Sequence, residues 1–426
     1  MKEIKRTLPS GIEIFSYPNP NSHSFYISLF VRAGSMYESE DSSGITHFLE
    51  HALIRNVNAQ MNGELYALLD KYGIEFNAST YSEMVQFYVS GAIKNFEIGA
   101  ELIGKIIHPL VLSSKELDTE RTRIKAEIRE SDDRTSLLSF TSGILHEGTS
   151  LSRSILGTLG SVSRISYKRL EEYRKSVFST GNVFVYVTGA AGDSELDVIS
   201  DKLSNITLQD GEKRNNMAPV SRNFGKREPK VHVKNADYTM LRFSFDMDMS
   251  KIGLAESDLL YDALLSGYNS RLFIEMSEKR GIFYDITGST ERYRNVGTLA
   301  FTFEVRSGEV EDAVRTVLDV LTDICDKGFS EGECMYAGYV DNVYMLYDDT
   351  RELNFTLAYD NHILDAGSTS LEERAERYRA VTPERLREVA TLLLRPENLT
   401  LTIKGKKKRI DTAALDKMIE CFRSEK

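Results

Sequence analysis

The sequence predicts two domains of the same fold, in which strands and helices are mixed. Three observations support this prediction. The chain has 426 residues, which suits two or three domains and is ample for a sizeable core. Strand and helix patterns alternate along the N-terminal part. A faint repeat recurs at an offset of about half the chain.

The first elements of the N-terminal part follow one another closely. Residues 13–17 (EIFSY) and 25–35 (FYISLFVRAGS) are rich in aromatic and β-branched residues, which is typical of strands. Residues 44–54 (GITHFLEHALI) place apolar residues at helical spacing. Residues 63–73 (GELYALLDKYG) predict a second helix that ends at Gly73, because glycine is a natural helix C-cap.

Two further strands and two long helices complete this part. Residues 74–80 (IEFNAST) and 84–91 (MVQFYVSG) predict strands. Residues 93–108 and 114–133 have the apolar spacing of long amphipathic helices.

A polar stretch and a short repeat indicate where the chain divides. Residues 208–222 (LQDGEKRNNMAPVSR) are polar and have no periodic pattern, which is typical of a linker between domains. The segment DKYGIEFNA at 70–78 resembles EKRGIFYDI at 278–286, at an offset of 208 residues, and each copy leads from a helix into a strand. We therefore expect an N-terminal domain at 1–212, a linker at 213–224 and a homologous domain at 225–426.

Composition and charge argue against several classes of function. No stretch reaches the ~18 apolar residues that a membrane helix needs, and the start (MKEIKRTLPSG) lacks the apolar region of a secretory signal. The net charge of -11 disfavours general nucleic-acid binding, and the basic run at 404–409 is expected to be a solvated strand end or turn. Cys325, Cys334 and Cys421 are scattered, so we expect buried free thiols in a reducing compartment. The expectation is a cytoplasmic protein that binds neither nucleic acid nor a membrane.

The HFLEH stretch at 47–51 is the strongest functional signal. On a helix, His47 and His51 share one face, so their imidazole nitrogens can bind one zinc ion. Glu50 is rotated by about 100° from His51 around the helix axis. It therefore lies beside the metal without having to bind it, which is where a general base belongs. The pattern is H-x-x-E-H, the inverted form of the zinc peptidase motif.

A catalytic zinc site needs a third protein ligand and one open position. The remaining histidines are isolated in the sequence, so we expect the third ligand to be a carboxylate. The predicted helix at 114–133 offers Glu120 and Glu127, which are seven residues apart and share a face, and Glu130 close to that face. Spacing alone does not choose among these three acids, and most acids on such a helix simply face solvent.

A family resemblance extends over both halves of the chain. Residues 34–56 (GSMYESEDSSGITHFLEHALIRN) resemble the zinc-motif region of the pitrilysin/insulinase family of zinc metallopeptidases, which includes the mitochondrial processing peptidase. NASTYSEMVQFY at 77–88 is similar to the strand pair after the family's zinc helix, and ERTRIKAE at 120–127 to the helix whose last glutamate is the third zinc ligand. The 75 residues between that glutamate and the HFLEH stretch match the family's spacing. SRLFIEMSEKRGIFYDI at 270–286 resembles the second-domain signature.

The resemblance implies an α+β fold of two homologous domains, each a mostly antiparallel sheet packed with helices on one side. Such a chain forms half of a clamshell and works as a dimer. Zn²⁺ would be bound by His47, His51 and Glu127, with Glu50 as the base. Glu120 would be a second catalytic carboxylate, one that orients a zinc ligand.

The resemblance also implies how a peptide substrate is bound. Asn77 and Ala78 would offer an edge strand to the peptide backbone, which selects extended peptides rather than particular side chains. In the family, an arginine seven residues before a tyrosine in the second-domain signature helps to hold the substrate and the oxyanion. Here the tyrosine is Tyr284, but Ser277 stands in the arginine's place, and serine cannot supply a planar cationic fork.

Two explanations of Ser277 remain open. In the first, the alignment with the family slips locally, and Arg271 or Arg280 compensates for the missing arginine. In the second, the chain forms a heterodimer with a paralogous subunit that carries this arginine. A homodimer with a weakened site is the alternative to the heterodimer.

We therefore expect a zinc-dependent endopeptidase that cleaves unfolded peptides, or leader or precursor segments, inside a dimeric chamber. The alternative is a non-catalytic peptide-holding or scaffold subunit of the same family. The intact histidines and glutamates favour the peptidase. A zinc hydrolase acting on non-peptide substrates has no support in the sequence.

Overall fold

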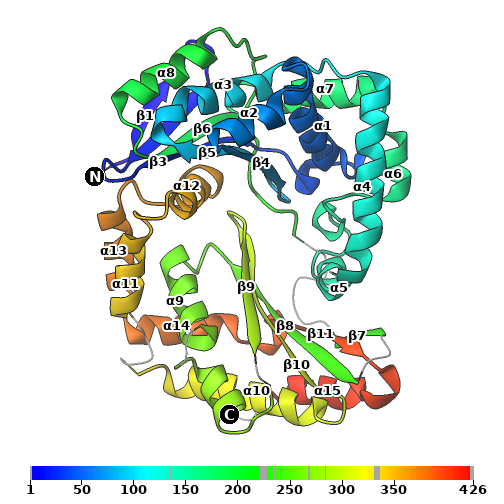
Figure 1. The fold of residues 1–426 in the computed structure, drawn as a ribbon. Coiled ribbons are helices and arrows are strands. Elements are labelled where there is room, and N and C mark those ends of the chain that lie inside the picture. Colours follow the sequence, from blue (N-terminus) through cyan, green and yellow to red (C-terminus); the bar gives the residue numbers. More distant parts are fainter. Residues whose placement is uncertain are drawn as a thin grey trace. The chain divides into compact units, whose positions relative to one another are not determined.

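The computed structural model describes residues 2–134, 136–220, 228–233, 237–266, 269–283, 285–330 and 336–422. Contacts between residues divide the chain into two compact units, each with its own sheet (Figure 1). Unit 1 comprises Met1–Ser136, Arg153–Pro219 and Tyr344–Leu371, and unit 2 comprises Leu137–Ser152, Val220–Val343 and Glu372–Lys426. The chain thus passes between the units more often than the single linker expected at 213–224 requires. Of that linker, residues 213–220 form no helix or strand, and the rest lies outside the described residues.

The sheet of unit 1 is mostly antiparallel. Its strand order is β1-β2-β6-β3-β5-β4, and every described neighbour pair is antiparallel except β2 and β6. The sequence analysis did not predict the first strand, β1. The strands that it did predict correspond closely to β2, β3, β4 and β5. The strands are β1 (Ile4–Thr7), β2 (Glu13–Pro18), β3 (Ser24–Val31), β4 (Glu75–Thr80), β5 (Val85–Ala92) and β6 (Val183–Gly189).

Helices pack on both faces of this sheet, whereas the family resemblance led us to expect them on one face. Alternate residues of a strand point to opposite faces. Phe25 of β3 packs into the apolar core with Phe96 of α3, whereas Ser28 of β3 donates a hydrogen bond to Asn354 of α12, at 2.7 Å. Figure 1 shows α3 and α12 on the two sides of the sheet. The helices of unit 1 are α1 (Ile45–Gln60), α2 (Leu65–Tyr72), α3 (Phe96–Ile107), α4 (Ser114–Arg134), α6 (Leu159–Arg164), α7 (Tyr167–Val177), α8 (Asp193–Ser204) and α12 (Thr350–Ala358), together with the short 3₁₀ helices η1 (Ser35–Tyr37), η2 (Glu40–Ser42) and η3 (Ile93–Asn95) and the π-helix η6 (Tyr359–Ile363).

Unit 2 is built around a sheet of order β7-β11-β8-β10-β9, in which β7 and β11 are parallel and the other pairs antiparallel. Its strands are β7 (Lys230–Val233), β8 (Tyr238–Asp248), β9 (Ile286–Arg292), β10 (Val296–Arg306) and β11 (Leu399–Gly405). Its helices are α5 (Ser136–Leu145), α9 (Leu254–Leu265), α10 (Val310–Lys327), α11 (Tyr336–Met345), α13 (Leu371–Arg379), α14 (Pro383–Leu393) and α15 (Thr412–Cys421), together with the π-helix η5 (Phe273–Glu278) and the short 3₁₀ helices η4 (Ser150–Ser152), η7 (Pro396–Asn398) and η8 (Lys407–Arg409).

The two units share one topology. Strands β2-β6-β3-β5-β4 of unit 1 correspond in order to β7-β11-β8-β10-β9 of unit 2, and the parallel pair occupies the same place in each. The repeat found in the sequence lies at equivalent points, between α2 and β4 and between η5 and β9. Its shared glycines, Gly73 and Gly281, have φ of 60° and 62°. The predicted fold class, two mixed α/β domains with mostly antiparallel sheets, is confirmed.

Two further expectations from composition can be compared with the described residues. None of the described helices is long and apolar enough to cross a membrane. Cys325 and Cys421 are free thiols, but Cys421 is exposed rather than buried, and Cys334 lies outside the described residues.

Candidate metal centre

The start of α1 is held in place by a buried carboxylate. Gly44 precedes the helix with φ of 85°, a left-handed conformation that favours glycine. The two carboxylate oxygens of Glu38 accept hydrogen bonds from the backbone N–H groups of Gly44 and Thr46, at 2.8 and 2.9 Å. These bonds satisfy donors that the first turn of a helix leaves free. The first turn of α1, which carries His47, is therefore fixed in position and direction.

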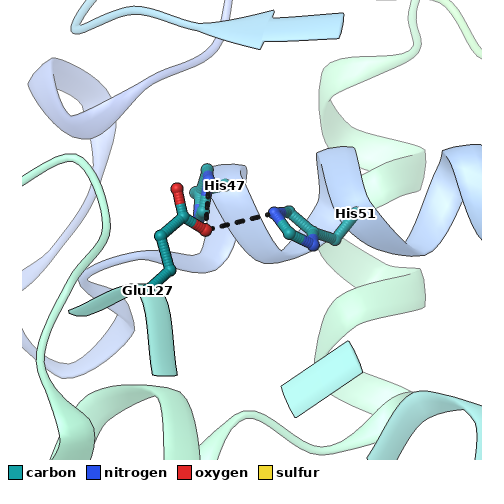
Figure 2. Close-up of side chains that lie close together, drawn as sticks. All are labelled: His47, His51 and Glu127. Carbon is teal, nitrogen blue, oxygen red and sulfur yellow. Dashed lines mark ion pairs between the residues drawn. The ribbon is translucent and has the colours of Figure 1, made fainter. Parts of the chain in front are cut away.

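His47, His51 and Glu127 converge in unit 1 (Figure 2). The two histidines project from one face of α1, and Glu127 reaches them from α4. One carboxylate oxygen of Glu127 lies 3.7 Å from Nε2 of His47 and 3.5 Å from Nε2 of His51. Ligand atoms of all three side chains lie within 4.8 Å of one another. Glu130, the other candidate on the same helix, is exposed and lies outside this group.

The two histidines have opposite pKa shifts. Burial lowers the pKa of His47 to about 4, the neighbouring His51 lowers it as well, and Glu127 acts against both. Burial also acts to lower the pKa of His51, but hydrogen bonding to Glu120 and Glu127 outweighs it and raises the pKa to about 9. Without a metal ion, His47 is therefore neutral at pH 7 and has a ring lone pair available to a metal, whereas His51 is charged and paired with carboxylates and must release a proton before it binds a metal.

Glu50 is also on α1, and it lies beside the group formed by His47, His51 and Glu127. Its carboxylate accepts a 2.5 Å hydrogen bond from the hydroxyl of Thr80, at the end of β4. Burial raises the pKa of Glu50, while Thr80 and His51 act to lower it. A mostly buried carboxylate with a raised pKa, held by one hydrogen bond, is suited to accept and return a proton.

Glu120 is almost completely buried between α1 and α4. One of its oxygens lies 3.6 Å from Nδ1 of His51, and the other pairs with the guanidinium groups of Arg55 and Arg123, at 3.4 and 3.0 Å. Burial alone would raise the pKa of Glu120, but His51, Arg123 and Arg55 lower it. Glu120 therefore stays ionised and orients the His51 ring.

Asn77 and Ala78 lie on β4, at the edge of the sheet. One side of β4 pairs with β5, and no described strand pairs with its other side. The side-chain Oδ1 of Asn77 accepts a hydrogen bond from the backbone N–H of Ala78 at 2.9 Å. Because Glu50 bonds to Thr80 of the same strand, this free edge runs past the candidate base.

The second-domain residues are only partly described. Tyr284 lies outside the described residues. Ser277 is on η5, half-buried. Both arginines that could compensate for it contact α10: Arg271 pairs with Asp323 at 2.8 Å, and Arg280 donates to Thr316 at 2.8 Å.

The donor set fits a zinc ion. Zinc in proteins is bound by histidine nitrogens and carboxylate oxygens, among other ligands, and a catalytic zinc site has three protein ligands. Here two imidazoles and one carboxylate converge, and the second carboxylate, Glu120, faces the other nitrogen of His51. Nδ1 of His47 is buried with no hydrogen-bond partner among the described residues.

Several residues of the site were not identified from the sequence. They are Thr80, Glu38, Arg55 and Arg123. Thr80 and Arg55 act through contacts with elements that are distant in the chain, which periodicity does not reveal, whereas Arg123 pairs with Glu120 one turn away on the same helix. Glu38 carried a weak signal, since an acidic residue shortly before a helix can cap it.

Comparisons with known proteins show which families and proteins the chain resembles. Residues 13–159 match the family model described as Insulinase (Peptidase family M16), and residues 164–337 match the one described as Peptidase M16 inactive domain. Over 398 residues the chain is 23% identical to an uncharacterized zinc protease of Streptomyces coelicolor, with 91% of this chain and 86% of that protein covered.

Solved structures show the same fold. A protease from Helicobacter pylori has a TM-score of 0.84 at 16% identity, with 95% of this chain and 99% of that chain covered. The periplasmic protease PqqL of Escherichia coli has a TM-score of 0.81 at 18% identity, with all of this chain but only 50% of that chain covered.

Proposed function

The chain belongs to the insulinase family of peptidases, family M16, and from this premise we propose that it is a zinc-dependent endopeptidase. The observation that carries the proposal is the convergence of His47, His51 and Glu127 with Glu50 beside them. A family resemblance in sequence alone does not require these side chains to meet, and in this chain they do.

The proposed reaction is hydrolysis of a peptide bond. His47, His51 and Glu127 would hold a zinc ion, which would supply Lewis-acid chemistry at the scissile carbonyl and at the attacking water. Glu50 accepts the proton of the attacking water and returns it to the leaving amine. Thr80 holds the Glu50 carboxylate in one orientation during both transfers, and Glu120 holds the His51 ring.

The proposed substrates are unfolded or extended peptides, including leader or precursor segments. The free edge of β4, with Asn77 and Ala78, offers backbone N–H and C=O groups to a peptide that adds as another strand. Such pairing needs an extended backbone, which a folded protein does not present. The edge ends at Thr80, next to Glu50, so a peptide bound there passes the base.

We further propose that the chain acts in a dimer, and specifically a heterodimer. The longer PqqL protease contains this fold over about half its length, which supports a second half supplied by another chain. The pairing of Arg271 with Asp323 and of Arg280 with Thr316 argues against compensation for Ser277 from within the described part of unit 2. A paralogous subunit would then supply the arginine. Peptidase activity that does not rise on mixing with a zinc-less, arginine-bearing paralogue would favour the homodimer.

The alternative function is a non-catalytic peptide-holding or scaffold subunit. Residues 164–337 match a domain described as inactive, so this part of the chain alone is consistent with either function. The intact cluster at 47–51 with Glu127 favours the peptidase.

A matched pair of variants on α4 tests the metal site. Glu127→Gln removes a ligand charge, so zinc affinity is expected to fall by at least about tenfold, together with cleavage of a quenched unstructured peptide. Glu130→Gln makes the same change three residues away on an exposed position and leaves zinc affinity unchanged. Chelation of the wild type abolishes cleavage, and added zinc restores it. Equal zinc affinity in the two variants would contradict the proposed ligand set.

A further inference from the structure

A small pocket opens beside the candidate base in unit 1. Its volume is about 210 Å³, and Glu50, His51 and Asn77 contribute to its wall. This volume is below the ~300–1,000 Å³ of sites for whole small-molecule ligands. The pocket therefore has room for one side chain of a larger substrate rather than for a separate ligand.

The pocket lies next to the strand edge along which we propose that a peptide binds. Asn77 belongs to the free edge of β4, and Glu50 is the proposed base. A peptide that lies along β4 with its scissile bond near Glu50 therefore directs a neighbouring side chain at this opening. The pocket is a candidate determinant of which peptides are cleaved.

The remaining wall carries two guanidinium groups, from Arg55 and Arg123. Both share a single oxygen of Glu120, at 3.4 and 3.0 Å, while the other Glu120 oxygen faces His51. The buried carboxylate of Glu120 thus contacts the two guanidinium groups and the imidazole of His51. Each guanidinium has five N–H donors, and the described contacts of these two arginines use one nitrogen each.

The two arginines differ in access to a substrate. The Arg123 side chain is 58% exposed, whereas the Arg55 side chain is 27% exposed and the Glu120 side chain only 3%. The accessible charge of this wall is therefore positive and belongs mainly to Arg123. Tyr66 of α2, also largely exposed, contributes an aromatic ring to the same pocket.

We propose that this pocket receives an acidic side chain, aspartate or glutamate, adjacent to the scissile bond, and that Arg123 with Arg55 selects it. The inference rests on the proposed peptidase function. A planar guanidinium binds a carboxylate with two parallel hydrogen bonds, which an uncharged amide side chain cannot match. The substrate class is then extended peptides that carry an acidic residue at one position next to the cleavage site.

Peptide binding tests this selection independently of catalysis. The Glu50→Gln variant of the 426-residue chain is titrated into labelled unstructured peptides in which each position in turn is Glu, Gln or Lys, and fluorescence anisotropy gives the Kd. At one position we expect Glu to bind about fivefold more tightly than Gln. Adding Arg123→Gln removes that preference, and Arg123→Glu shifts it towards Lys.

Arg129→Gln is the matched control. Arg129 lies on the same helix, is exposed and is not part of the pocket wall, so its substitution changes the net charge equally. The Glu preference is expected to persist in this variant. Thermal melting of each variant checks that the fold is retained.

The outcomes separate this inference from the proposed function. Equal Kd for Glu and Gln peptides at every position overturns the inference, as does a preference that Arg129→Gln removes as fully as Arg123→Gln. No binding of any peptide, by the chain alone or with its partner subunit, overturns both proposals. A Glu preference lost with Arg123→Gln supports the inference even if the zinc-loaded wild type cleaves nothing, in which case the peptidase proposal alone fails.

Discussion

Thr80 and Glu50 join the edge strand to the zinc-motif helix: the hydroxyl of Thr80 on β4 donates a 2.5 Å hydrogen bond to the carboxylate of Glu50 on α1. The strand that is free to pair with a peptide and the residue proposed to transfer protons are thus held together directly. A side chain so placed acts on the orientation of the base rather than on peptide affinity.

Thr80→Val should lower kcat with little change in KM. Valine keeps the shape of threonine but removes the donor, so the Glu50 carboxylate loses its fixed orientation. We expect a fall in kcat of about tenfold, a fraction of what general base catalysis contributes. Steady-state kinetics on a quenched peptide measure this, and Thr80→Ser, which keeps the hydroxyl, should retain most of the activity. Equal losses in the valine and serine variants would show that the hydrogen bond is not responsible.

Gly44→Ala should destabilise unit 1 more than Gly63→Ala. Both glycines have left-handed φ, 85° and 90°. A Cβ at Gly44 would lie 2.6 Å from the carbonyl oxygen of Leu156, whereas a Cβ at Gly63 would meet nothing within 4 Å. The Gly63 variant therefore measures the backbone strain alone, about 1 kcal/mol.

We expect Gly44→Ala to lower the free energy of unfolding by about 2 kcal/mol more than Gly63→Ala does, because the clash adds to the strain. Chemical denaturation of both variants gives this difference. A displaced first turn of α1 should also weaken zinc binding at His47. Equal destabilisation of the two variants would refute the proposed close approach at Gly44.

The sequence predicted the zinc-motif helix and the repeat because both depend on local pattern. The i, i+4 spacing of His47 and His51, the C-cap at Gly73 and the strand periodicity near 74–91 are set by neighbours in the chain. The choice of Glu127 over Glu130 came only from the family's spacing, since both are close to one helix face and only packing against α1 separates them.

Contacts between distant segments could not be predicted in this way. Helix α12 begins at Thr350 yet packs on the sheet of unit 1, where Asn354 bonds to strands that end before residue 190. No periodicity in 350–358 indicates which sheet it covers. The same reason hides the pairing of Arg55 with Glu120, which depends on the crossing of α1 and α4.

Asn354→Ala should destabilise unit 1 by about 2–3 kcal/mol. The fully buried amide accepts from the Ser28 hydroxyl at 2.7 Å and donates to the backbone carbonyls of Tyr26 and Tyr186 at 3.3 and 3.0 Å. Its loss leaves these buried groups without that partner, which carries the full desolvation cost. Thr356→Ala, on the same helix, removes only a 3.4 Å contact near the surface and should change stability by less than about 0.5 kcal/mol. Urea denaturation compares the two; similar values would contradict the packing of α12.

Asp262 should make unit 2 less stable as the pH rises from about 4 to about 7. Burial, opposed by a hydrogen bond with Ser266 and assisted by the charge of Asp258, raises the pKa of Asp262 to about 6. An aspartate in an unfolded chain has a pKa of about 3.9. The folded state thus binds this proton more tightly, so the stabilisation is complete below the unfolded pKa and is lost as the pH rises through about 6.

In Asp262→Asn the side chain at position 262 is uncharged between about pH 4 and about pH 7. The free energy of unfolding of this variant should therefore lack the fall that Asp262 causes in the wild type. Denaturation of the wild type and the variant at pH 4, 5, 6 and 7, the pH range that brackets the two pKa values, gives the difference between them. The variant should gain stability relative to the wild type towards pH 7. A constant difference across this range would rule out the raised pKa.

The most direct test of the central claim measures bound zinc and peptide cleavage together, in the wild type and in Glu50→Gln. The account predicts one zinc per chain in both proteins, since Glu50 lies beside the ligands without being one of them. It predicts cleavage of an unstructured peptide by the wild type, alone or with its partner subunit, and a loss of at least about a hundredfold in the variant under the same conditions. Full cleavage by Glu50→Gln, or a wild type that binds no zinc when zinc is supplied, would contradict it.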